Sequence, residues 1–124
     1  MASQLNATKA FYTQVGAVVD NLIDMFPDDA DFPTFKTFLN LLQHTNPALV
    51  INTFHQSIAL KFADQIRNRN EKFLIDYTPV EYGSDVTDIV SKIKNYWSVL
   101  DAQTKDSLWQ YLYILMELSK KAVV

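Results

Sequence analysis

The side chains that most often carry catalysis or bind metals are few and widely spaced in this sequence. The chain has two histidines, His44 and His55, and no cysteine. A helical zinc site needs ligands four residues apart on one face, and neither histidine has a carboxylate at helical spacing. The lack of cysteine also excludes a thiolate nucleophile and a disulfide framework. We therefore predict no bound metal and assign both histidines to ordinary polar or helix-end roles.

A run of acids, Asp28, Asp29 and Asp31, invites comparison with a calcium loop. A twelve-residue loop that started at Asp29 would place Pro33 at its fifth position and Thr34 where glycine is required. This excludes an EF-hand. Acids at the start of a helix favour the positive end of the helix dipole, so we interpret the run as a helix-start signal.

Nucleotide and ester hydrolysis are also not expected. The chain contains only two glycines, Gly16 and Gly83, so it has neither a Gly-rich phosphate loop nor a Gly-x-Ser-x-Gly elbow. A carboxylate pair for glycoside chemistry is assembled in space, so spacing does not exclude it, but nothing in the sequence favours it. We predict a non-enzymatic protein without a cofactor.

The densest basic cluster is the best candidate for contact with nucleic acid. It consists of Lys61, Arg67, Arg69 and Lys72. Acids within the same stretch reduce its net charge, and basic residues near a helix C-terminus are expected from the helix dipole alone. A solvated helix end is therefore the favoured interpretation. Nucleic-acid binding is the alternative function, and as a partner class nucleic acid is not favoured.

The stretch 76–85 is the main predicted loop, because it holds Pro79 and Gly83 and shows no clear period. Exposed aromatic residues on a loop can anchor a protein partner, and Tyr77, Pro79 and Tyr82 are the candidates here. The equal alternative is that these tyrosines fold back over the helices.

Composition indicates a folded globule. The 124 residues are 48% hydrophobic and 20% charged, and the formal net charge of −3 disfavours a general attraction to nucleic acid or to anionic membranes. One domain over residues 1–124 is of ordinary size. The N-terminal residues show no basic stretch followed by an apolar run, so we expect an unprocessed chain in the cytosol or nucleus, a reducing compartment.

Periodicity and capping signals predict the first three helices. The first ends at Pro27 and contains Gly16, which either permits a close helix crossing or is simply tolerated. The second follows the acidic run, carries Pro33 in its first turn and ends by Thr45. Asn46-Pro47 opens the third, in which apolar residues recur every four positions over 50–66.

The C-terminal half adds a short turn over 71–75, a long helix that starts at Ser84 or Asp85, and a last helix capped by Asp101. Residues 108–118 of this last helix are apolar nearly all round. Such a helix is either central to its own domain or shared with a partner, and this run is far shorter than the roughly 20 residues that span a bilayer. We predict an all-α, single-domain bundle of about five helices with an apolar central C-terminal helix and no membrane span.

Short segments along the chain carry a resemblance to a known group of proteins. They are Phe26-Pro27-Asp28-Asp29, Phe35-Lys36-Thr37, Thr45-Asn46-Pro47, residues 66–70, Phe73-Leu74, Tyr96-Trp97, Leu108-Trp109 and Tyr111-Leu112. In their order the chain resembles short, uncharacterised all-helical proteins of nucleocytoplasmic large DNA viruses. The resemblance implies a viral protein that acts in an infected cell or is packaged in a virion, and it brings no catalytic motif.

Missing catalytic groups and surplus aromatic residues together favour a non-enzymatic protein–protein interaction or assembly module. The partner is a protein of unknown identity, and a homo-oligomer is one possibility.

Overall fold

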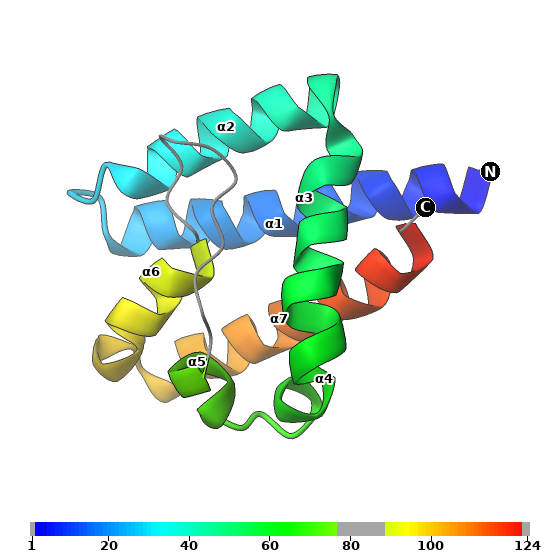
Figure 1. Cartoon of the computed structure of the whole chain (residues 1–124). Helices are drawn as coiled ribbons and strands as arrows, with labels where there is room; N and C mark the ends of the chain where they lie inside the picture. Colours follow the sequence, from blue (N-terminus) through cyan, green and yellow to red (C-terminus); the bar gives the residue numbers. More distant parts are fainter. Residues whose placement is uncertain (1, 77–88, 123–124) are drawn as a thin grey trace.

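The computed structural model describes residues 2–76 and 89–122, which form helices and no strand (Figure 1). In chain order the elements are α1 (Ala2–Met25), α2 (Asp31–Thr45), α3 (Pro47–Phe54), the π-helical turn η1 (His55–Ala59), α4 (Leu60–Arg67), α5 (Lys72–Asp76), α6 (Ile89–Tyr96), the 3-10 turn η2 (Trp97–Val99) and α7 (Ala102–Ala122). The prediction of an all-α fold is confirmed.

The helix boundaries follow the signals in the sequence. Asp29 Oδ1 accepts a hydrogen bond from the Asp31 backbone N–H at 3.0 Å at the start of α2, but the N-cap residue is Ala30, so no acidic side chain caps this helix. Asp101 Oδ1 accepts one from the Thr104 backbone N–H at 2.7 Å and so caps α7 as predicted. Bonds from the Thr104 backbone, and then from its side chain, lower the pKa of Asp101. The caps predicted at positions 84 and 85 lie outside the described residues.

Gly16 is the one glycine among the described residues, and it lies inside α1. A Cβ atom built there has no other heavy atom within 4 Å beyond the local helix and chain neighbours. No neighbouring helix therefore needs a glycine at this position, so of the two interpretations simple tolerance is the correct one.

The predicted third helix is a single rod made of α3, η1 and α4 (Figure 1). Side chains spaced four residues apart drift around an α-helix, because its period is 3.6 residues. A π turn rotates the chain by fewer degrees per residue, so it reduces this drift. This keeps Val50, Phe54, Ile58 and Ile66 all buried against the same core. Just beyond the π turn, Phe62 leaves helical geometry with φ −122° and ψ 19°, which kinks the rod.

The buried apolar side chains form one cluster with contributions from every α-helix. Within it α7 lies along α1 and also contacts α3, η1 and α4, as Figure 1 shows. The buried residues of α7 are Leu108, Trp109, Leu112, Leu115, Met116, Ser119 and Ala122. The prediction of a central C-terminal helix is confirmed, but one side of α7 is open, with Tyr113 45% and Ile114 38% exposed.

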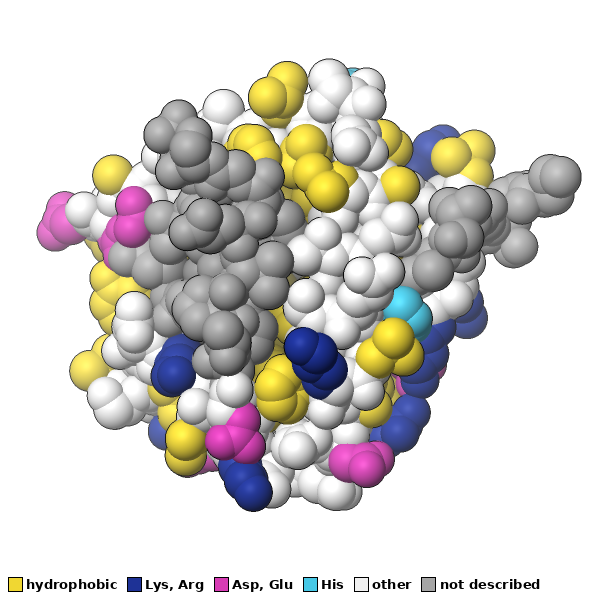
Figure 2. Space-filling view, in the orientation of Figure 1, with side chains coloured by type: hydrophobic (Ala, Val, Ile, Leu, Met, Phe, Trp, Pro, Cys, Tyr) yellow, Lys and Arg dark blue, Asp and Glu magenta, His cyan; other side chains and the backbone are white. Residues whose placement is uncertain are grey.

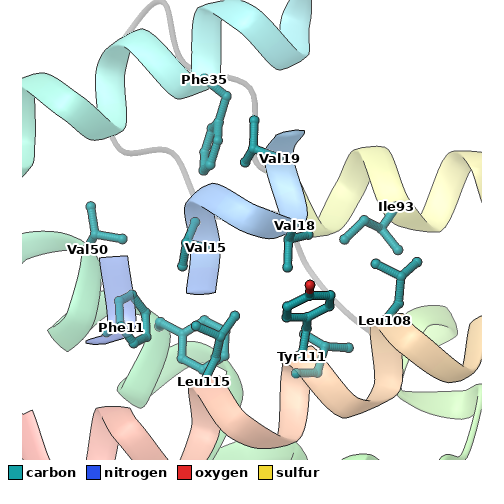
Figure 3. Close-up of a pocket in the computed structure, with 12 residues that line it drawn as sticks. Phe11, Val15, Val18, Val19, Phe35, Val50, Ile93, Leu108, Tyr111 and Leu115 are labelled. Carbon is teal, nitrogen blue, oxygen red and sulfur yellow. The ribbon is translucent and has the colours of Figure 1, made fainter. Parts of the chain in front are cut away.

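A small apolar cavity of about 40 Å³ lies where α1, α2, α3, α6 and α7 meet (Figure 3). Val15 and Val18 of α1, Phe35 of α2, Val50 of α3 and Leu115 of α7 are among its walls. Its volume leaves room for about one more methylene group in the core.

One polar contact ties α1 to the start of the α3 rod. The hydroxyl of Tyr12 donates a hydrogen bond to the Pro47 carbonyl oxygen at 2.7 Å. Tyr12 is only 5% exposed, and its burial raises the pKa of the phenol to about 12. Across the described part of the chain, no helix combines the length and apolar character that a membrane crossing requires.

Candidate functional site

A groove of about 350 Å³ lies between the end of α4 and the middle of α7. Its lining residues come from two stretches of sequence far apart: Ile66, Arg67 and Arg69 from the first, and Trp109, Gln110, Tyr113 and Ile114 from the second. Ile66 and Trp109 are buried, whereas Tyr113 and Ile114 are exposed. The groove therefore combines a packed floor with accessible apolar side chains.

The end of α4 gives the groove its shape. Arg69 has a φ of 52°, the only positive φ of a non-glycine residue among those described. The Asn70 N–H donates to the Gln65 carbonyl at 2.8 Å and the Arg69 N–H to the Ile66 carbonyl at 3.2 Å. This is the left-handed helix ending in which glycine is usual. A residue with a Cβ atom costs about 1–2 kcal/mol there, so the turn is strained.

The same turn brings the guanidinium of Arg69 to α7, where it pairs with the carboxylate of Asp106. Gln110 Nε2 donates to the other carboxylate oxygen of Asp106 at 3.0 Å. Arg67 has a weaker partner, because its Nη1 lies 3.7 Å from Asp64 Oδ1 and the Asp64 side chain is 89% exposed. Such an exposed pair contributes about 1 kcal/mol at most, so the Arg67 guanidinium is readily available to another carboxylate.

The floor of the groove is held by an aromatic cluster. Trp109 packs edge-to-face on Trp97 with ring centroids 5.3 Å apart, and Phe73 lies 6.2 Å from Trp109. Trp97 Nε1 donates to Glu71 Oε1 at 2.8 Å, and the Lys105 ammonium lies 5.3 Å from the Trp97 ring centroid. These contacts fix the Trp109 ring, so the groove has a preformed base.

The structure brings two of the four predicted basic residues together. Arg67 and Arg69 both line the groove, whereas Lys61, near the start of α4, and Lys72, at the start of α5, are exposed outside it. Figure 2 shows Lys and Arg side chains interspersed with acidic ones along the lower right edge of this face. Of the four residues, only Arg67 and Arg69 share the groove.

The predicted partner residues Tyr77, Pro79 and Tyr82 lie outside the described residues. The sequence did not single out Tyr113, Ile114 or Gln110 as a surface. The signal that could have found them is the apolar character of 108–118 on nearly every side, which allows a helix shared with a partner as well as an enclosed one.

The histidines occupy polar positions within the fold. His44 Nδ1 donates to the Asn40 carbonyl at 2.8 Å. His55 Nδ1 lies 3.5 Å from Ser119 Oγ, but Ser119 is fully buried and donates its hydroxyl proton to the Met116 carbonyl at 2.8 Å. Ser119 is therefore no accessible nucleophile. Within the described ranges, no three His, Asp or Glu side chains gather in a group that could hold a metal.

No protein-family model, curated protein or solved structure matches this chain.

Proposed function

We propose that this chain is a non-enzymatic protein–protein interaction or assembly module whose docking surface is the α4–α7 groove. One observation carries the proposal: exposed Tyr113 and Ile114 lie beside Arg67 and Arg69 over a fixed tryptophan floor. Tyr, Trp and Arg are the residue types enriched where protein interfaces concentrate their binding energy.

Site-specific photocrosslinking tests this proposal. A photoreactive amino acid replaces Tyr113 in the groove or, as the matched control, Leu41 on α2, which is 57% exposed and does not line the groove. We expect crosslinks to a defined protein from the Tyr113 position and none from Leu41. The same crosslinked species from both positions, or none from Tyr113, would contradict the proposal.

Nucleic-acid association remains the alternative. Tyr113 next to Arg67 and Arg69 offers a stacking surface with cations, as single-strand binders do. It is less favoured because Arg69 already pairs with Asp106 and the chain carries a net charge of −3. This alternative requires binding that weakens steeply with salt and with loss of Lys61, Arg67, Arg69 and Lys72.

For its biological setting we propose a viral protein of the infected cell or the virion, in a reducing compartment. The resemblance to helical proteins of nucleocytoplasmic large DNA viruses supports the first part, and the absence of cysteine supports the second. Mass spectrometry of purified particles and of infected-cell fractions tests both. Deletion of residues 77–82 tests whether Tyr77, Pro79 and Tyr82 add a second contact.

A further inference from the structure

The turn between α1 and α2 projects from the molecule at the left end of the helix pair in Figure 1. It is held by Tyr96, whose ring stacks on Phe26 with centroids 4.0 Å apart and whose hydroxyl donates to Asp29 Oδ2 at 2.5 Å. A braced turn presents its tip in a fixed shape, which lowers the entropy lost when the tip binds.

The tip of this turn is both acidic and apolar. It consists of Asp24, Met25, Pro27 and Asp28, which are all exposed. The carboxylates of Asp24 and Asp28 have no ion pair or hydrogen bond in the part of the chain that the structure describes. These two negative charges are thus not compensated by any described residue, and they lie next to an apolar methionine side chain that is 38% exposed.

The α4–α7 groove has the complementary character. Tyr113 and Ile114 are suited to receive an apolar side chain, and Arg67 at the rim is suited to receive a carboxylate. Arg67 is held only by highly exposed Asp64 at 3.7 Å, and a guanidinium has five N–H donors, so it can bind a second carboxylate without losing the first.

Resting on the interaction function proposed above, we propose that the occupant of the groove is the α1–α2 turn of a second copy of this chain. The turn lies at the upper left of Figure 1 and the end of α4 at the bottom of the molecule, so the two do not meet within one molecule. Contact between two different surfaces joins copies head to tail into rings or open chains, or into a closed dimer where both contacts form reciprocally about a two-fold axis.

One turn in one groove is a small contact, below the roughly 1,000 Å² of buried surface expected for a stable interface. Association is therefore weak and appears only at concentrations of roughly 0.1 mM and above.

Sedimentation equilibrium over a concentration series tests the proposal. We expect the average mass of the wild type to rise with concentration. Asp28→Lys at the tip and Tyr113→Ser in the groove should each weaken association about tenfold or more. Asp76→Lys is the matched control, because Asp76 is exposed, lies in neither surface and makes the same change in charge. It should associate as the wild type does.

Mixing the two variants gives the sharper result. The intact tip of Tyr113→Ser fits the intact groove of Asp28→Lys, so an equimolar mixture should form dimers that do not extend further. A wild type that stays monomeric, an Asp76→Lys effect equal to that of Asp28→Lys, or a mixture that does not dimerise overturns self-association.

The two proposals fail separately. A monomeric wild type whose crosslinks from Tyr113 reach a different protein removes self-association and leaves the interaction function intact. If the wild type stays monomeric and position 113 gives no crosslinked partner, both proposals are refuted.

Discussion

Replacement of Arg69 by glycine should leave the protein about as stable as the wild type, whereas replacement by alanine should not. Both variants lose the guanidinium and its pair with Asp106, so they differ only at the backbone. The φ of 52° costs a residue with a Cβ atom about 1–2 kcal/mol. Glycine removes this cost, but its greater conformational entropy in the unfolded chain offsets about 0.4–1 kcal/mol of the gain. Arg69→Gly should therefore exceed Arg69→Ala in stability by about 1 kcal/mol.

Against the wild type, the glycine variant loses an ion pair between side chains that are 46% and 48% exposed. Such pairs contribute about 0.2–1 kcal/mol, so the gain at the backbone roughly offsets the loss. Binding of a partner at the proposed α4–α7 groove gains nothing from the relieved backbone, so it should weaken in both variants. A stable variant that binds poorly would indicate that the strained turn is kept for the groove rather than for the fold.

Urea denaturation followed by circular dichroism measures the difference, and the melting temperatures of the two variants should differ by about 4 °C. Repeating the comparison in an Asp106→Asn background removes the ion pair from the reference protein too, so only the backbone difference at position 69 remains. An alanine variant as stable as the glycine variant would refute the assignment of strain to the left-handed turn.

Three further substitutions test the helices and the core. Gly16→Ala should raise the free energy of unfolding by about 1 kcal/mol, because a Cβ meets nothing there; a loss in urea denaturation would contradict this. Val18→Ile should fill part of the 40 Å³ cavity and add about 0.5–1 kcal/mol; a crystal structure with displaced helices would count against it. Burial raises the pKa of Tyr12 from 10.0 to about 12, so its stabilisation is complete below pH 10 and is lost as pH rises through 12. Tyr12→Phe should lose less stability over that range, as urea midpoints at each pH would show.

Most of the helix order could be predicted because its signals are local. Pro27, Pro33 and Pro47 mark ends and first turns, and the Asp101 cap needs only the next three residues. The π turn at His55–Ala59 could not be predicted in this way. Apolar residues here recur every four positions, whereas the α-helix repeats every 3.6, and only the packed core shows that a π turn keeps them on one face.

The groove was only partly predictable. The sequence identified Arg67 and Arg69 as neighbours, but the pairing of Arg69 with Asp106 joins residues 37 apart and depends on how α4 meets α7. Periodicity also could not predict which face of α7 is exposed, because a helix that is apolar on nearly every side gives no sign of which residues face outward. Tyr113 and Ile114 are exposed because α1 and α4 pack against other faces of α7.

The packing of α1 along α7 has a consequence for synthesis on the ribosome. About 75 residues separate the end of α1 from the start of α7, which takes roughly 4–15 s to translate. During that interval the apolar stripe of α1, with Phe11, Val19 and Leu22, lacks the helix that will cover it. The nascent chain thus exposes the apolar face of an amphipathic helix for seconds, and chaperones that recognise such helices should bind it before α7 emerges.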